Sequence, residues 1–374
     1  MVSMILLFSL FYSIIRYSSE IFAGGNPYLT GDWLINYAGG YSGRGLNGQL
    51  LLFLSELTNL SLLWLTYCEQ ILLYFIYVIT IIKILRSVNN RYLWMIALSP
   101  VFIMFDFLDT GGAFRKEIIA FTFLGLLVRM NQLGKFTWMH FLPIASLYLL
   151  SAFSWEASII FLIPTLYFTF LLQKDGILSS VNFKIISLYF TVISVLSLLG
   201  SFIFQLNSSS EVARAICDTL VQKGLDSKIC SGTIYSVSSV SPNIPDTLYS
   251  LVIESKFSYY LPVILFALFP FLLNGWLKRR YPLVFCFFLS VLPIFLVGLD
   301  WGRWIHIFGT LVTLVWVLEA SRSTDLRFFG NSLAKNLLFV FFSLFFTSAW
   351  RIPYAGGLPE GIFFGVIARL ISWL

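Results

Sequence analysis

Basic residues suited to binding an anion recur in short polar stretches between apolar segments of this sequence. The guanidinium group of arginine donates two parallel, charge-assisted hydrogen bonds, a geometry that matches a phosphate. Most of these cations stand beside a glycine or an aromatic residue, as in Gly43-Arg44-Gly45 and Gly302-Arg303-Trp304. The pattern predicts a site for an anionic, phosphate-containing group, with the candidate ligands Arg44, Arg115, Lys116, Arg303 and Arg351.

The same stretches contain candidates for proton transfer. Glu156 follows Ser154-Trp155 at the start of an apolar segment, where burial would raise the pKa of its carboxyl and suit it to general acid or base catalysis. Asp32 and Asp300 are second candidates. His306 lies one helical turn beyond Arg303, so it is a candidate phosphate partner or base.

Each candidate also has a structural interpretation. Glu156 would stabilise a helix if it lay in the first turn, where a negative charge favours the helix dipole. The arginines would serve as interfacial anchors or as ion-pair partners, for example Arg303 with Asp300 and Arg115 with Asp109. A single histidine such as His306 is commonly structural. The functional interpretation depends on the recurrence of arginine on one face of a membrane.

Composition indicates that the chain lies in a membrane. Hydrophobic residues make up 58% of the 374 residues and charged residues only 11%, too few to cover the surface of a water-soluble domain. The net charge of +6 is what inward-facing Lys and Arg produce in a membrane protein, so we expect no nucleic-acid binding. The first apolar stretch has no basic residue before it and no clear cleavage site, which favours a retained span.

The apolar segments predict an all-α, polytopic helical bundle of about eleven or twelve transmembrane helices. A short or tilted helix is expected at 50–65. The expected spans are 2–22, 67–85, 92–108, 118–130, 137–152, 157–172, 185–204, 259–276, 283–299, 305–318, 335–350 and, more weakly, 361–374. This alternation collects Lys83, Arg86, Arg129, Lys174 and most other cations on the inner side, which places the candidate site residues outside.

Three regions follow from this pattern: a membrane bundle at 1–204 with an outer loop at 23–49, an extracytoplasmic segment at 205–256, and a second membrane bundle at 257–374. Cys217 and Cys230 both fall in the outer segment, where an oxidising compartment predicts a disulfide, with two free thiols as the alternative. Cys68 and Cys286 are expected in the core. The sequence has no metal-ligand spacing and no nucleotide-binding motif, so neither metal nor cofactor is expected.

Two motifs resemble a known family. The stretch from Phe114 to Ala120, followed by Ser151 to Pro164, is similar to the central region of Wzy-type and EpsG-type bacterial polysaccharide polymerases. The glycine-rich outer loop with Asp32 and Arg44 is also similar to such proteins, as is the Asp300-Trp-Gly-Arg303 turn. This chain has Glu156 where many EpsG-like members have a histidine.

The resemblance implies a GT-C-like, metal-independent glycosyltransferase that polymerises oligosaccharide units into O-antigen, capsule or exopolysaccharide. Its substrates would be undecaprenyl pyrophosphate-linked oligosaccharides at the periplasmic face of the bacterial inner membrane, with membrane lipids and a chain-length regulator as further partners. Arg44, Arg115 and Arg303, with Arg351 fourth, would bind the pyrophosphate, and Glu156 would activate or orient the acceptor. The alternatives are another polyprenyl-linked-sugar transferase, an O-antigen ligase, and a flippase or transporter of lipid-linked glycans.

Overall fold

The chain forms an all-α, multi-pass membrane bundle, as the sequence predicts. The computed structural model describes residues 2–88, 96–109, 111–207, 209–237, 249, 256–273, 275–298, 300–322 and 350–352. Within these ranges, six helical segments are long and apolar enough to cross a membrane: Val2–Phe22, Leu62–Arg86, Glu156–Lys174, Ser180–Phe204, Trp276–Leu296 and Trp301–Arg322. The shorter segments Trp138–Ser154 and Ser258–Leu272 are also apolar helices. The two spans predicted at 335–350 and 361–374 lie outside the described residues, except for Trp350.

The chain divides into two compact units that each combine distant parts of the sequence. Unit 1 comprises Met1–Ser9, Ile81–Ala113 and Pro242–Leu374, and unit 2 comprises Leu10–Thr80 and Phe114–Ser241. These boundaries differ from the predicted division at 204 and 256, because unit 2 joins most of the first membrane region to the outer segment. The units are therefore described one at a time.

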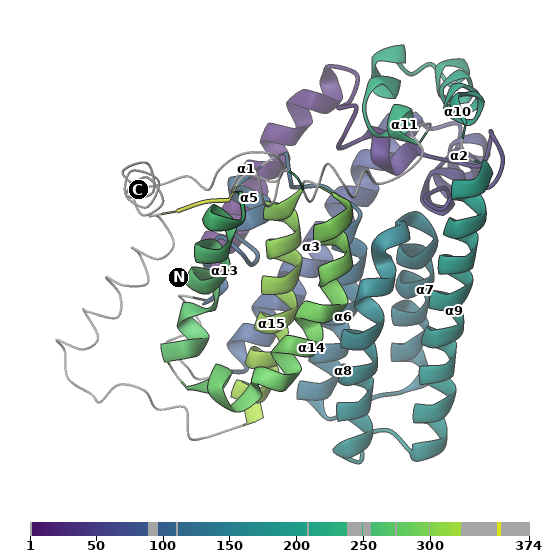
Figure 1. Ribbon diagram of the computed structural model, residues 1–374. Helices are drawn as coiled ribbons and strands as arrows, with labels where there is room; N and C mark the ends of the chain where they lie inside the picture. Colours follow the sequence, from purple (N-terminus) through teal and green to yellow (C-terminus); the bar gives the residue numbers. More distant parts are fainter. Residues whose placement is uncertain are drawn as a thin grey trace. The chain divides into compact units, whose positions relative to one another are not determined.

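The centre of unit 2 is α6 (Glu117–Leu133), which is buried on nearly every side, as expected for a helix that is apolar all round. Around it pack α7 (Trp138–Ser154), η2 (Glu156–Phe161) and α8 (Leu162–Lys174), and α9 (Ser180–Asn207) lies against α7 and α8 (Figure 1). The smaller η1 (Gly31–Leu34) and α2 (Leu46–Thr58) pack together, and α2 also contacts α7. The two short helices η1 and α2 thus form a layer at one end of the bundle, which we name the short-helix layer.

The outer segment packs onto this short-helix layer. It contains α10 (Ser210–Gln222), η3 (Ser227–Ser231) and α11 (Thr233–Ser236). Cys217 and Cys230 form the predicted disulfide, with Cα atoms 5.7 Å apart. The buried side chains of this segment share one core with η1, α2 and the start of α3 (Leu62–Arg86), and this core comprises Leu34, Ile35, Leu51, Leu52, Leu62, Ile216, Leu220, Leu225, Ile229, Ile234 and Val237. The segment is therefore a cover that is bound to the outer loop.

Unit 1 is built around α15 (Trp301–Arg322), whose side chains are almost all buried. The helices α13 (Lys256–Leu273) and α14 (Trp276–Val297) pack against it and against each other. The outer faces of α13 and α14 expose large apolar side chains such as Leu265 and Phe285, as expected for surfaces that meet lipid. The unit also contains the first residues of α1 (Val2–Phe22), as far as Ser9.

The predicted span at 92–108 is wrong for residues 98–104. Ile96 and Ala97 are helical, residues 98–104 form hydrogen-bonded turns, and the short helix α5 (Phe105–Leu108) follows. Pro100 has no backbone N–H and disfavours helical backbone in the residue before it. The segment is apolar because it is buried within unit 1, where the Val101 carbonyl lies against His306 of α15. A run of apolar residues indicates that a segment is buried, and a buried segment can form turns as well as a helix.

Two further expectations need correction. The helix predicted at 50–65 is two helices, because α2 ends at Asn59, whose φ of 55° is left-handed and stops the helix before α3 begins at Leu62. Cys68 and Cys286 are exposed and do not belong to the core. In a membrane bundle the outward positions are apolar too, so hydrophobicity does not separate inward from outward side chains.

Candidate functional site

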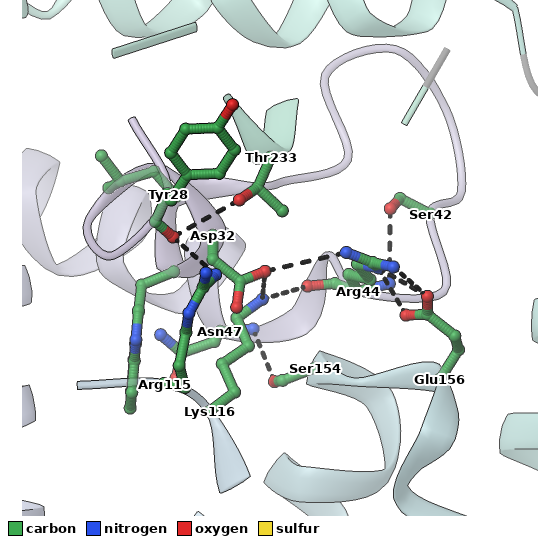
Figure 2. A network of polar contacts seen from close by, with 12 residues as sticks. Tyr28, Asp32, Ser42, Arg44, Asn47, Arg115, Lys116, Ser154, Glu156 and Thr233 are labelled. Carbon is green, nitrogen blue, oxygen red and sulfur yellow. Dashed lines mark hydrogen bonds and ion pairs between the residues drawn. The ribbon is translucent and has the colours of Figure 1, made fainter. Parts of the chain in front are cut away.

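Unit 2 brings together four of the predicted site residues, Asp32, Arg44, Lys116 and Glu156, which we name the four-charge cluster (Figure 2). Asp32 belongs to η1, Arg44 to the loop before α2, Lys116 to the residue preceding α6, and Glu156 to the first position of η2. Because α6 and η2 both begin here, the cluster lies at one end of the helices of unit 2. Residues far apart in sequence thus form one charged site.

The exposed edge of the cluster is the ion pair between Arg44 and Glu156. Arg44 Nε donates to Glu156 Oε1 at 2.7 Å and to Oε2 at 2.5 Å, and Nη2 also donates to Oε1. The side chains are 29% and 32% exposed, so both remain within reach of a substrate. A guanidinium with several donors on one carboxylate has the geometry that also binds phosphate.

The inner part of the cluster is formed by Lys116 and Asp32. The side chain of Lys116 is fully buried, and its Nζ donates to the carbonyl oxygen of Arg44 at 3.0 Å. Asp32 Oδ1 lies 3.9 Å from Lys116 Nζ and 3.9 Å from Arg44 Nη1, so it stands between the two cations. Burial lowers the pKa of Lys116 to about 8, and the Asp32 carboxylate opposes this shift. Lys116 is therefore mostly charged at neutral pH.

A second polar layer connects the cluster to two helices. The side-chain amide of Asn47 donates to Glu69 Oε2 of α3 at 3.0 Å, and the backbone N–H of Asn47 donates to Ser154 Oγ at 3.1 Å. Ser154 is the last residue of α7 and stands two positions before Glu156. Sequence reasoning missed Asn47 and Ser154, because neither is charged and only the fold brings them together.

The turn before Lys116 is held in an unusual backbone conformation. Phe114 has a φ of 56°, in the left-handed region that a bulky side chain rarely adopts. Its N–H donates to the hydroxyl of Tyr74 at 2.8 Å, and its carbonyl accepts from Trp33 Nε1 at 2.7 Å and from Gln70 Nε2 at 3.1 Å. With both backbone groups engaged by buried side chains, this turn is fixed, which sets the direction of the two cations that follow.

Arg115 has a different position from the one predicted for a phosphate ligand. Its side chain is buried, and Nη1 donates to the backbone carbonyl of Tyr28 at 3.0 Å (Figure 2). The hydroxyl of Thr233 in α11 donates to the same carbonyl at 3.4 Å. Arg115 and Thr233 of the outer segment therefore both bind the outer loop at the Tyr28 carbonyl. This contact makes Arg115 a residue that positions the loop.

The remaining predicted site residues belong to unit 1. Arg303 Nη1 lies 3.2 Å from Asp300 Oδ2, so the ion pair that sequence offers as a structural alternative is present. His306 is buried, with Nδ1–H donating to the Val101 carbonyl at 3.3 Å and Nε2 lying 3.6 Å from Asp106 Oδ1. Arg351 is exposed and also belongs to unit 1.

Comparisons of the chain with protein-family models, with curated proteins and with solved structures give no match. The features of the chain that bear on function are therefore the chemistry of the four-charge cluster, its place at one end of the helices of unit 2, and the resemblance of its motifs to the polysaccharide polymerases.

Proposed function

We propose that this protein is a membrane glycosyltransferase that polymerises oligosaccharide units carried on undecaprenyl pyrophosphate, with the four-charge cluster as its catalytic site. The observation that carries the proposal is the multidentate Arg44–Glu156 pair at an accessible edge, supported from within by the buried cation Lys116. This arrangement places a phosphate-binding group and a carboxylate base side by side, which is the combination that the reaction requires.

Donor binding would use the exposed edge. A pyrophosphate offers the same paired oxygen acceptors as the Glu156 carboxylate, so it would replace Glu156 on the guanidinium of Arg44. Lys116 would add a second positive charge from a buried position, where electrostatic interactions are stronger than in water. Both cations then lie where negative charge develops on the leaving group.

Release from Arg44 would leave Glu156 available as the general base. The acceptor sugar hydroxyl attacks the anomeric carbon of the donor, and its proton passes to the Glu156 carboxylate. The bond between the anomeric carbon and the phosphate oxygen breaks, and the electron pair leaves with undecaprenyl pyrophosphate. One glycosidic bond forms and one glycosyl phosphate bond breaks, so the donor itself supplies the driving force.

The charge distribution of unit 2 supports placing this site at the periplasmic face of a bacterial inner membrane. The opposite helix ends in this unit carry Arg129 near the end of α6, Lys174 at the end of α8 and Lys184 near the start of α9. Because cytoplasmic ends of spans are enriched in Lys and Arg, the four-charge cluster would face outwards.

A second candidate function, the transport of lipid-linked glycans, is favoured by one feature. The first six residues of the membrane segment Glu156–Lys174 form the 3-10 helix η2, which continues directly into α8. Irregular membrane helices often bind substrate in transporters. In this protein, however, the charged pair lies at the helix end, and an enzyme needs no path across the bilayer.

The test is polymer formation by the purified full chain in detergent, with the lipid-linked repeat unit of its host as substrate. The proposal predicts a ladder of lengthened glycans from the wild-type chain and only the single unit from the Glu156→Gln variant. A transporter would leave the substrate unchanged in detergent, because there are no compartments to connect. Absence of any lengthened product from a folded, disulfide-bonded wild-type protein would exclude the polymerase.

A further inference from the structure

Unit 1 contains an open apolar groove that the proposed function does not use. It has a volume of about 690 Å³ and lies among side chains of α13, α14 and α15, including Ile264, Leu268, Phe285 and Phe308. Among the side chains that line it, only Tyr281 and Cys286 contain an atom other than carbon and hydrogen. A volume in the range of roughly 300–1,000 Å³ is typical of a pocket that holds a small molecule.

Two exposed cations stand at one end of this groove. Lys278 precedes the lining residues Tyr281, Pro282 and Phe285 by three, four and seven positions, so it shares their face of α14. Arg279 bears the same relation to Pro282 and Cys286. Because helical side chains lean towards the N-terminus, we expect both cations to lie at the end of the groove nearest the start of α14, where Leu277 also lines it.

These cations are available to a ligand, unlike their neighbour. Among the described residues, neither Lys278 nor Arg279 has a hydrogen bond or an ion pair, and both are exposed. Arg280 is already engaged, since its Nε donates to Glu319 Oε2 at 3.0 Å. The groove therefore ends at two positive charges that have no partner in the described part of the chain, next to one paired arginine.

The apolar lining of the groove and the two cations at its end together indicate which ligand would bind there. In a bilayer an apolar groove by itself has no preference, because lipid tails are as apolar as the side chains of the groove. Cations at the cytoplasmic end of membrane helices attract anionic head groups. We propose that this is a binding site for an anionic phospholipid, with an acyl chain in the groove and the phosphate of the head group at Lys278 and Arg279.

The free cysteines provide a local test and a matched control. Cys286 lines the groove, whereas Cys68 is a cysteine of α3 in unit 2 that is also exposed. A small bimane fluorophore is attached to Cys286 in a Cys68→Ser chain, and in a second protein to Cys68 in a Cys286→Ser chain. Each labelled protein is reconstituted into phosphatidylcholine vesicles that contain a fixed fraction of a brominated lipid, whose acyl chains quench the fluorophore. The brominated lipid is phosphatidylglycerol in one set of vesicles and phosphatidylcholine in the other.

At Cys286 we expect brominated phosphatidylglycerol to quench more strongly than brominated phosphatidylcholine, and at Cys68 we expect equal quenching. Each cation should favour the anionic lipid by roughly fivefold, equivalent to about 1 kcal/mol. The preference should disappear in the Lys278→Gln, Arg279→Gln double variant and remain in a control that removes the exposed Lys174 and Lys184. In the wild-type chain it should also weaken in 1 M salt, where the Debye length falls to about 3 Å.

Three results would overturn the proposal. Equal quenching by both lipids at Cys286 would mean that the groove accepts any acyl or isoprenoid chain. An equal preference for the anionic lipid at Cys286 and Cys68 would indicate general attraction to a basic protein. A preference at Cys286 that survives both the loss of Lys278 and Arg279 and high salt would place the selecting charge elsewhere. The salt series uses the unmodified cations, so it remains decisive if the double variant folds poorly.

Discussion

The four-charge cluster of unit 2 and the Asp300–Arg303 turn of unit 1 each pair an arginine with a carboxylate, but in different arrangements. In unit 2, Arg44 pairs with Glu156, a residue 112 positions away in the sequence, at a partly exposed edge. In unit 1, Arg303 pairs with Asp300, only three positions away, and its guanidinium also lies 5.1 Å from the ring centre of Trp304.

This difference shows which charges are available for chemistry. A pair formed within one helical turn is determined locally, and it forms wherever that turn is helical. A pair formed between distant segments needs the whole fold to place it, and it opens without disrupting either helix. The long-range pair is therefore the better candidate for exchanging a carboxylate for a substrate phosphate, and the local pair is the better candidate for a structural contact.

The largest effect is expected from breaking the long-range pair. Glu156→Gln should lower the rate of polymer formation by roughly 10²–10⁴-fold, because the general base is lost. Arg44→Gln should have a similar effect, and the double variant should be little worse than either single one, since residues that act as a unit are not additive. The measurement is glycan length over time in the detergent assay.

The matched control is the Lys223–Glu56 pair, which is also in unit 2 and has an N–O distance of 2.8 Å with side chains 33% and 60% exposed. Lys223→Gln should change neither activity nor stability appreciably, because exposed ion pairs contribute about 0–1 kcal/mol. Normal polymer length in membranes that contain the folded Glu156→Gln protein would contradict the assignment of the base.

The next effect concerns the disulfide that closes the cover over the outer loop. Replacing Cys217 and Cys230 by serine should destabilise this segment by about 3 kcal/mol in the chain-entropy picture, which corresponds to a roughly 150-fold larger population of the locally opened form. Amide hydrogen exchange over residues 209–237 measures it. Exchange in α6 serves as the internal control and should not change, because α6 is not part of the core shared with the cover. Unchanged protection over 209–237 would show that packing alone holds the segment.

A smaller effect is expected from the titration of Lys116. Its pKa is lowered to about 8, so its charge is lost as pH rises through that value, and activity should then fall by about tenfold per pH unit. Lys116→Arg should remove this alkaline limb, because arginine stays charged. A pH–rate profile of both proteins tests this, and an identical alkaline limb in the two would exclude Lys116 as its source.

The lowered pKa of Lys116 affects stability in the opposite direction: activity falls as the pH rises, whereas the free energy of unfolding increases. Between about pH 8 and the ordinary value of 10.5, the folded chain binds fewer protons at Lys116 than the unfolded chain does. The contribution of Lys116 to the free energy of unfolding therefore increases with pH across this window. Thermal unfolding of the wild-type chain and of Lys116→Met at several pH values would reveal it, with the difference between them changing only above about pH 8.

The smallest effect is expected in unit 1. Arg303→Gln should cost about 1 kcal/mol of stability, and Asp300→Asn in the same chain should recover part of it, because the two charges compensate each other. Thermal unfolding of the four proteins in this cycle gives the coupling energy. Loss of polymerisation in a stable Arg303→Gln protein would remove the distinction between the two regions and assign a substrate role to both.

Much of the site was predictable from the sequence, because charges are rare in an apolar chain. Asp32 and Arg44 are the charged residues of the glycine-rich outer loop, Lys116 and Glu156 each stand at the start of an apolar segment, and all four belong to the cluster. Their pairing was not predictable. Nothing in the sequence near Arg115 indicated that its guanidinium donates to the backbone carbonyl of Tyr28, 87 positions away.

The fold was predictable where length and hydropathy act together. The first span was expected at 2–22 and α1 covers Val2–Phe22, and the spans at 118–130 and 137–152 correspond to α6 and α7 with small shifts at their ends. The span at 92–108 was wrong for residues 98–104, because a buried turn segment and a membrane helix have the same apolar composition. Composition reports the environment of a segment and leaves its backbone conformation open.

The sequence by itself determined that this protein lies in a membrane, that it is helical, and which charged residues are exceptional, because these properties follow from the transfer of each side chain from water to an apolar phase. Tertiary structure alone decided that Arg44 pairs with Glu156, that Lys116 is buried behind them, and that Asn47 links Glu69 to the end of α7. These contacts join segments separated by tens of residues, and only the packing of the helices sets their distances.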